Sequence, residues 1–447
     1  MNKLRDKVKV LLFARSFLAE YYSDFESDII EPIFVTLTHE EKTFLEGKGW
    51  NVYGCFEDEY ESLKVAKFAD NYLKTSFHSD RFLGRFDHEK RMEILGKEIS
   101  FWSRIFDTTS PSFLVNETIA VEIAEVMAIE AKKRNIPFYT SLLGFIPGTF
   151  YWKPDPFTGR LNDINSIEPD EKAVTMARTY VKNMVEKQER PFYVANTHRR
   201  NVTIKKLLSS FIGDAIRYIQ EKNSQKFKIF RYEDYSSFFF ANQREFVRKL
   251  KYSYDNFELF KKKNYLFYPM HVEPEAILSY FVPENYTQIE VIENIIKAAK
   301  VNQSVIVKEH PQHPGILLSD KFQELKKIYS NLYYLPSYEL SFPILDRCDA
   351  VVTLTSSVGW EALVLGKPVF VLGEIFFDQC NGVKRIESFR QLKDELRKEE
   401  YVLPNKDQIE TFAAQMISQF HKGCPSPMSS EKGLNHYVSE IEKIACR

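Results

Sequence analysis

Short apolar strands that alternate with amphipathic helices constrain this chain more than any other feature. In the first third the strands are KVKVLLFA, PIFVTLT, NVYGCF, SFLVN and IPFYTS, each followed by a helical pattern or a turn. The alternation resumes at residue 264 with NYLFYPM, SVIVK, LYYLP, AVVTLT and PVFVLG. Strands separated by helices pair in parallel, with helices on both faces of the sheet. The sequence therefore predicts an α/β protein with two doubly wound, Rossmann-like domains that face a cleft.

The region between the two alternating runs is helical, charged and aromatic, and we interpret it as a helical insertion between the domains. A chain of 447 residues also exceeds what one ordinary core supports. Helical periodicity is further expected from about residue 60 to residue 102. The predicted divisions are 1–162 for the N-terminal Rossmann-like domain, 163–263 for the insertion, 264–425 for the C-terminal Rossmann-like domain, and 426–447 for a helix that packs back toward the N-terminal domain.

Composition narrows the classes of function. The formal net charge is −1, so the whole-molecule field favours no nucleic-acid partner, and any anion site must be local. The 5 cysteines are scattered and form no CxxC pair, so neither a disulfide framework nor a zinc site is expected. No apolar run reaches the roughly 20 residues of a membrane span, and the N-terminus lacks the core of a signal peptide. We therefore expect a cytoplasmic protein.

The strand SVIVK ends in KEHP, which places three ionisable groups and a proline beyond a buried strand. Ligands of doubly wound sheets bind there, beyond the carboxyl ends of the strands. His310 can bind a phosphate oxygen as a donor or a cation, and Lys308 can add a charge unless alternation turns it to the opposite face. A purely structural histidine is the alternative. His313 lies nearby, but no carboxylates at a suitable spacing accompany the pair, so no metal site is predicted.

A serine-rich turn follows the strand AVVTLT. Thr355, Ser356 and Ser357 lie between that strand and the start of a helix. Free backbone N–H groups and the helix dipole favour an anion there, hydroxyls add donors, and Gly359 lets the backbone approach closely. Glu361, at the exposed start of the helix, can accept both hydroxyls of a ribose. Alternatively, the serines only cap the helix and Glu361 complements its dipole.

A third polar strand end follows NYLFYPM, where His271 and Glu275 stand in the sequence HVEPEA. Three strand ends in one domain that all offer polar groups favour a shared ligand over coincidence.

Three segments, FYPMHVEPEA, VIVKEHPQHPG and VVTLTSSVGWEALVLGKPVFVLG, resemble in this order the capsule polysaccharide synthesis proteins, the group that contains bacterial Kdo transferases. The resemblance covers roughly residues 265–382. Upstream, LLGFIPGTFYWKPDPFTGRLN is similar to the glycine-proline segment of this family, and the matching positions are Gly144, Pro147, Asp155, Gly159 and Asn162. The resemblance implies a GT-B-like glycosyltransferase that uses a nucleotide-activated sugar. The pairing of motifs is also similar to that of bacterial sialyltransferases, which use CMP-sugars.

The resemblance also implies roles for particular residues. His310 and Pro311, with the hydroxyls of Ser356 and Ser357, would bind the donor phosphate. The expected substrate-binding residues are His271, Glu275, Gly144 and Asn162.

The catalytic carboxylate stays open, because this chain has TSLLG where relatives carry an acid before the glycine that Gly144 matches. Glu117 is the first candidate, since it directly follows the strand SFLVN. Asp155 is the second, and the acids of FEDE (Glu57, Asp58 and Glu59) are the third. Each of these can equally be a surface acid near a helix N-terminus.

We expect the transfer of a sugar, such as Kdo or another CMP-activated sugar, from a nucleotide donor to a capsule or surface polysaccharide acceptor, without metal or cofactor. A carboxylate would act as general base or nucleophile. The alternatives are a CDP-polyol or glycerophosphate transferase of the same frame, a sugar 2-epimerase, and a non-catalytic nucleotide-sugar-binding partner in capsule assembly. The basic and aromatic segment 244–263 could contact the cytoplasmic face of the inner membrane, a lipid-linked acceptor or capsule assembly proteins, or it could be a solvated helix pair.

Overall fold

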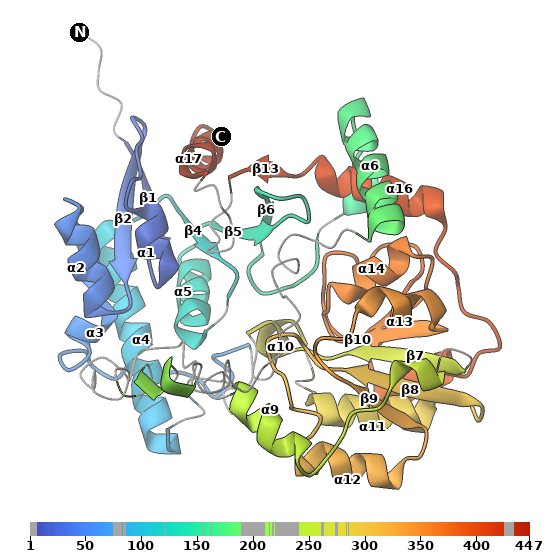
Figure 1. The fold of residues 1–447 in the computed structure, drawn as a ribbon. Coiled ribbons are helices and arrows are strands. Elements are labelled where there is room, and N and C mark those ends of the chain that lie inside the picture. Colours follow the sequence, from blue (N-terminus) through green and yellow to red (C-terminus); the bar gives the residue numbers. More distant parts are fainter. Residues whose placement is uncertain are drawn as a thin grey trace. The chain divides into compact units, whose positions relative to one another are not determined.

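The computed structural model describes residues 7–74, 83, 86–119, 121–153, 155–161, 163–188, 211–213, 215–216, 219, 241–260, 263–272, 276–282, 284, 286–423 and 433–447. The chain forms two compact units (Figure 1). Unit 1 comprises residues 1–158, 224–233 and 419–447, and unit 2 comprises residues 159–223 and 234–418. Both are α/β units whose sheets are parallel in unit 2 and mainly parallel in unit 1, which confirms the predicted fold class.

Unit 1 contains a seven-stranded sheet with the strand order β13-β6-β5-β4-β1-β2-β3. Its parallel strands are β1 (Val8–Phe13), β2 (Ile30–Thr36), β3 (Val52–Cys55), β4 (Phe113–Glu117) and β5 (Phe138–Leu143). Two strands were not predicted: β6 (Thr149–Lys153), which runs antiparallel to β5, and β13 (His421–Lys422), which runs antiparallel to β6.

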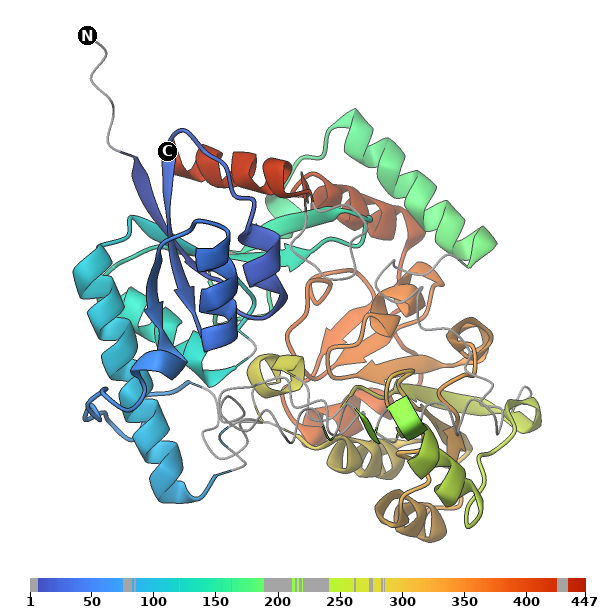
Figure 2. The same cartoon turned by 60° about the vertical axis from the view of Figure 1, so that its left-hand side comes forward.

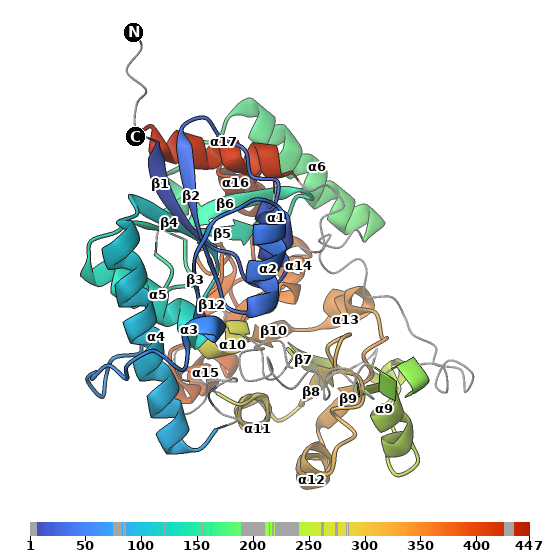
Figure 3. The same cartoon turned by 90° about the vertical axis from the view of Figure 1, so that its left-hand side faces the viewer.

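Helices cover both faces of this sheet (Figure 3). The elements are α1 (Phe17–Tyr22), α2 (His39–Gly47), α3 (Phe56–Glu59), α4 (His88–Thr109), α5 (Glu122–Lys133) and α17 (Leu434–Ala445). One core joins β1, β2 and β4 to α1 and α17, and Tyr22, Phe150 and Tyr437 lie fully buried within it. Residues 60–74, where a helix is predicted, are not helical. The helix α4 begins at His88, where the side chain of Asp87 caps it by accepting the N–H of Lys90.

Unit 2 contains a six-stranded sheet with the order β12-β11-β10-β7-β8-β9. Its strands are β7 (Asn264–Pro269), β8 (Gln303–Lys308), β9 (Leu332–Leu335), β10 (Ala350–Thr353), β11 (Val369–Val371) and β12 (Val383–Arg385), all parallel. The first five were predicted and β12 was not. β7 and β8 are buried almost throughout, as expected of central strands covered on both faces.

The helices of unit 2 form two layers (Figure 1). On one face α11 (Gln288–Ala298), α12 (Asp320–Ile328) and α15 (Phe389–Leu396) pack against the strands in a single core. The opposite face carries α13 (Ser341–Arg347) and α14 (Val358–Val364). α10 (Ala276–Phe281) follows β7.

The predicted insertion is described only in part. Its helix α6 (Glu171–Lys187) packs against α16 (Lys406–Ile417) and α14 within unit 2 (Figure 2), and the short 3-10 turn η2 (Ile164–Ser166) contacts α16. Helix α9 (Ala241–Lys249) and the 3-10 turn η5 (Phe257–Phe260) lead into β7. No described helix has the length and apolar character that crossing a bilayer requires.

Candidate functional site

The strand order of unit 2 reverses direction at β7. From β7 the chain adds β8 and β9 on one side, and it then adds β10, β11 and β12 on the other. At such a switch point the connections diverge, so ligands of doubly wound sheets bind beyond the carboxyl ends of the two central strands. His271 follows β7, His310 follows β8 and Thr355 follows β10, so three predicted site residues lie at the ends of three adjacent strands.

Helix α11 positions His271. The capping box of Thr287 and Glu290 starts this helix, which places Gln288 in its first turn. The Gln288 side chain accepts the backbone N–H of His271 at 2.6 Å and donates to its carbonyl at 3.1 Å. Gln288 was not predicted, although the pattern T-x-x-E marks the helix start where it lies.

The imidazole of His271 is buried and bonded to Thr355. Its Nε2 accepts the backbone N–H of Thr355 at 3.2 Å and lies 3.3 Å from the Thr355 hydroxyl. Burial, and then the neighbouring His310, lowers the pKa of His271 to about 3, so the ring is neutral. Because Nε2 accepts, the proton belongs on Nδ1, a buried atom with no hydrogen-bond partner among the described residues.

His310 is a second neutral imidazole. Its Nδ1 accepts the backbone N–H of Gln312 at 3.2 Å, which leaves Nε2 to carry the proton. Burial, followed by the charges of Lys308 and His313, lowers the pKa of His310 to about 4. The two imidazoles are near enough for His310 to depress the pKa of His271. The site thus offers two neutral N–H donors rather than two cations.

The serine-rich turn uses most of its backbone donors internally. Thr353 Oγ1 accepts the N–H of Ser356 at 3.0 Å, and Ser356 Oγ accepts the N–H of Val358 at 3.3 Å. Ser357 is the N-cap of α14, but its side chain makes no capping bond. The prediction of several free backbone N–H groups here is therefore wrong, and the groups that remain in the turn are mainly the hydroxyls of the half-buried Ser356 and Ser357.

Two features of α14 also differ from expectation. Glu361 is 1% exposed, so it does not lie on an exposed helix start where a ribose could reach it directly. A Cβ at Gly359 would lie 2.7 Å from the ring of Phe377, so this glycine is required for packing between α14 and Phe377. The contact of Gly359 follows from the packing of the helix start against Phe377, in the loop after β11.

Two of the polar residues in the strand end KEHP, Lys308 and Glu309, form hydrogen bonds within the protein. The ammonium of Lys308 is buried and donates to the carbonyls of Glu309 and Ser337 at 3.2 and 3.3 Å. These bonds turn the ammonium of Lys308 toward carbonyls of the protein itself. Pro311 is half-buried and follows His310 directly. Lys308 and Glu309 are bonded within the protein, so His310 is the ionisable group of KEHP that is left for a ligand at the switch point.

Glu309 holds the loop that carries His310. Its carboxylate accepts the N–H of Gly315 at 3.0 Å, the N–H of Leu317 at 2.8 Å and the hydroxyl of Tyr254 at 2.8 Å. Burial raises the pKa of Glu309 to about 7, against these three bonds. The sequence prediction missed this role.

The segment that contains Gly159 belongs to unit 2. The N–H of Gly159 donates to Glu374 at 2.8 Å, and Arg160 lies 3.2 Å from the same carboxylate and 3.5 Å from Asp378. A Cβ on Gly159 would lie 2.4 Å from the carbonyl of Glu374, so only glycine fits. Burial raises the pKa of Asp378 to about 6 although Arg160 opposes this.

The candidate carboxylates lie in unit 1. Glu117, at the end of β4, forms an ion pair with the buried Arg15 at the end of β1. Asp155 is exposed and accepts the N–H of Phe157 at 2.9 Å. The FEDE acids form α3, where Asp58 pairs with Lys42 and Glu59 pairs with Arg104.

Gly144, a predicted substrate-binding residue, is enclosed within unit 1. A Cβ there would lie 2.3 Å from Thr149 Oγ1 and 3.2 Å from Phe420, so the tight turn between β5 and β6 requires glycine. Glu275 and Asn162 lie outside the described residues.

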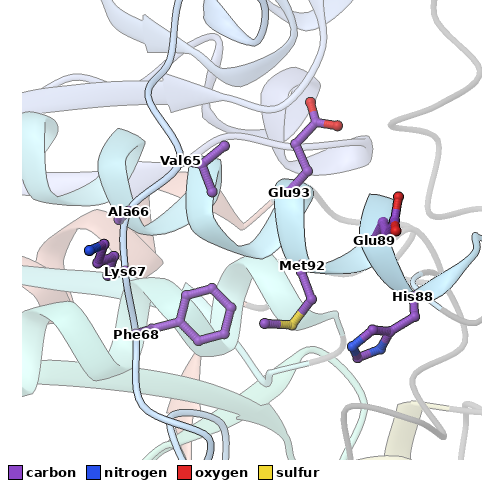
Figure 4. Close-up of a pocket in the computed structure, with 8 residues that line it drawn as sticks. All are labelled: Val65, Ala66, Lys67, Phe68, His88, Glu89, Met92 and Glu93. Atoms are coloured by element: carbon purple, nitrogen blue, oxygen red, sulfur yellow. The ribbon is translucent and has the colours of Figure 1, made fainter.

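A pocket of about 600 Å³ lies elsewhere in unit 1, between residues 65–68 and the first turns of α4. Figure 4 shows Phe68 and Met92 facing each other across it, with His88 beside Met92. None of the predicted site residues lines this pocket. Within the described ranges, no three or more histidine, cysteine, aspartate or glutamate side chains gather as metal ligands would.

Comparisons with known proteins place these features in context. The family model "Capsule polysaccharide biosynthesis protein" matches residues 171–419. No curated protein sequence matches the chain.

Three solved structures are similar over most of their length. The β-Kdo 2,7 transferase of KpsC from Thermosulfurimonas dismutans is 14% identical, with coverage of 80% of this chain and 91% of that chain and a TM-score of 0.34. The β-Kdo 2,4 transferase of the same protein is 13% identical, with coverage of 73% and 87% and a TM-score of 0.39. UDP-GlcNAc 2-epimerase from Neisseria meningitidis is 13% identical, with coverage of 99% and 100% and a TM-score of 0.26.

Proposed function

The chain belongs to the capsule polysaccharide biosynthesis protein family, and on that premise we propose that it is a glycosyltransferase of capsule or surface polysaccharide synthesis. The donor is a nucleotide-activated sugar, and the acceptor is a growing glycan. The observation that carries the proposal is the convergence of His271, His310 and Thr355 at the switch point of unit 2.

The two imidazoles bind the phosphate of the donor as neutral hydrogen-bond donors. Each has one ring nitrogen committed as an acceptor within the protein, so the opposite N–H of each is the one left for a ligand. The Nδ1 of His271 is buried, so a phosphate binds it only if the atoms that cover it move aside. Fixed donors in a buried site stabilise developing charge without reorganisation. The hydroxyls of Ser356 and Ser357 add donors beside them.

In the transfer step the bond between the anomeric carbon and the phosphate oxygen breaks, and its electron pair stays on the phosphate. The acceptor oxygen forms the new bond to the anomeric carbon and gives up its proton to a carboxylate. Glu117 is our first candidate for that carboxylate, because its ion pair with Arg15 fixes it at a strand end. Asp155 is the second.

We further propose that the donor is CMP-linked, with Kdo as one such sugar, and that transfer needs no metal ion. The support for this is that the two imidazoles and the serine hydroxyls offer hydrogen bonds that can stabilise the charge of a phosphate. Transfer measured in excess EDTA should therefore equal transfer without it.

The test uses the full chain with a panel of CMP-, CDP-, UDP- and GDP-linked donors and a capsule glycan acceptor. His310→Ala should lower kcat by about 10² to 10³, the usual effect of removing one donor to a developing charge. His313→Ala is the matched control, because this residue lies in the same loop but faces Arg244 and Arg248. Equal activity of His310→Ala and the native protein on the correct donor would contradict the proposal.

Other outcomes would identify the alternatives. Transfer of a polyol phosphate from a CDP-linked donor would indicate the polyol-phosphate transferase. Binding of CMP without hydrolysis or transfer to any acceptor would indicate a non-catalytic partner in capsule assembly.

A further inference from the structure

Helix α9 is amphipathic in the reverse of the usual sense. At 3.6 residues per turn, positions 246, 247 and 250 fall on one side of the helix. Phe246 is 42% exposed, Val247 is 62% exposed and Leu250, just past the helix, is 76% exposed. Surface helices of soluble proteins normally turn such side chains toward the core.

The charged side of α9 faces the protein instead. Arg248 donates to the carbonyl of Gly315 at 2.7 Å, and a Cβ on Gly315 would lie 2.7 Å from the Cα of Glu245. Glu245 is itself 6% exposed. The polar contacts to the loop of His310 therefore fix the orientation of α9, and this orientation turns the apolar side outward.

Cations flank the apolar side. Lys249 pairs with Glu245 at 2.7 Å and Lys251 pairs with Asp320 at 2.8 Å, and the lysine side chains are 40% and 64% exposed. The pair of Lys251 and Asp320 is exposed on both sides and contributes little to stability, so exchanging Asp320 for a lipid phosphate is not opposed by much. Glu245 is buried, so Lys249 keeps its ion pair and contacts lipid phosphates with its remaining N–H donors. The segment 241–263 contains seven basic and three acidic residues. Lys261 and Lys262 lie outside the described residues.

We propose that α9 docks unit 2 onto an anionic lipid bilayer. Phe246, Val247 and Leu250, the docking face, enter the boundary between headgroups and acyl chains, while Lys249 and Lys251 contact lipid phosphates. A basic flank beside exposed aromatic and aliphatic side chains matches an anionic membrane better than a neutral protein surface. The proposal stands on this surface alone and does not depend on glycosyl transfer.

Docking would also place the candidate site at the membrane. α9 contacts the Gly315 region of the loop that carries His310. A helix with its side chains is about 10–12 Å across, so a bilayer on the outer side of α9 lies about one helix diameter from that loop.

The experiment is sedimentation of the full chain with vesicles of phosphatidylcholine containing 30 mol% (about one lipid in three) phosphatidylglycerol, and with pure phosphatidylcholine vesicles. The first variant is Phe246→Ser/Val247→Ser/Leu250→Ser, and the second is Lys249→Gln/Lys251→Gln. Val402→Ser/Leu403→Ser is the matched control, because it removes two side chains of unit 2 that are 75% and 67% exposed. Thermal unfolding of each variant checks that it folds.

The native chain should sediment with the anionic vesicles and not with the neutral ones. The lysine variant should bind about 25-fold more weakly, from about 1 kcal/mol per cation near a charged surface. The serine variant should lose binding, and the control should keep it. Binding that survives both α9 variants, or no binding to anionic vesicles, overturns the proposal. So does a dimer in lipid-free sedimentation velocity that the serine variant dissociates, because a second copy then covers the docking face.

Discussion

Glu309 makes the stability of unit 2 depend on pH in an unusual direction. Its folded pKa of about 7 lies above the ordinary value of 4.5, because burial outweighs the three hydrogen bonds that the carboxylate accepts. For an acid raised in this way, the folded state keeps a proton that the unfolded state has lost between these two pH values. The contribution of Glu309 to the stability of unit 2 is therefore fully present below about pH 4.5, and it is lost as the pH rises through 7. At about 1.4 kcal/mol per pKa unit, the loss is about 3 kcal/mol.

Glu309→Gln removes this titration while it keeps the size of the side chain. The NH₂ group of the new side chain cannot accept a hydrogen bond, so the backbone N–H of either Gly315 or Leu317 loses its acceptor. This loss lowers the free energy of unfolding by about 1–3 kcal/mol at every pH. The informative quantity is therefore the difference in unfolding free energy between the variant and the native chain. This difference should shift in favour of the variant by about 2.5 kcal/mol between pH 5 and pH 8.

Urea unfolding at pH 5, 6, 7 and 8 measures this difference, with Glu324→Gln on the exposed side of α12 as the control that should show no shift. A difference that is the same at all four pH values would refute the reasoning. A shift of opposite sign would show that the backbone N–H groups of the loop, and not burial, dominate the carboxylate.

Three other predictions concern the packing and charge of unit 2. Gly159→Ala should lower the stability by about 1–3 kcal/mol, because the new Cβ meets the carbonyl of Glu374. The control is Gly47→Ala, which has open space around the new Cβ and should be neutral. Thermal unfolding compares the two variants. The ring ¹⁵N shifts of His271 and His310 should be those of neutral imidazole at pH 6, and an imidazolium signal from either would contradict the burial argument. Gln288→Ala should cost about 1–3 kcal/mol by leaving two backbone groups of His271 unpaired, as chemical unfolding would detect, and an unchanged midpoint would show that water replaces the amide.

The sequence predicted ten of the strands because each is an apolar run bounded by turn residues and followed by a helical pattern or a turn. It did not predict β13, which has two residues and exists only because His421 meets Phe150 far upstream. Pairing over such a distance leaves no local pattern. The non-helical stretch after α3 was also missed, since its charged and apolar residues happen to fall at helical spacing.

The site was predictable where topology alone decides the outcome. The carboxyl ends of adjacent parallel strands must meet at one edge of a sheet, so His271, His310 and Thr355 could be brought together from the sequence. The directions of Lys308 and Glu361 could not. Whether a charged side chain turns to a ligand or to the protein depends on acceptors that other segments supply, such as the carbonyl of Ser337 for Lys308.

Helix α17 has a consequence for the order of biosynthesis. Its Tyr437, Val438 and Ile441 fill the core formed by β1, β2 and α1, so the part of unit 1 that leaves the ribosome first lacks one side of its core until residues 434–445 are translated. The second half faces no such delay. A nascent chain stalled shortly before residue 434 should therefore hold a finished C-terminal sheet beside an incomplete N-terminal one, which makes the amino-terminal half the natural client of chaperones.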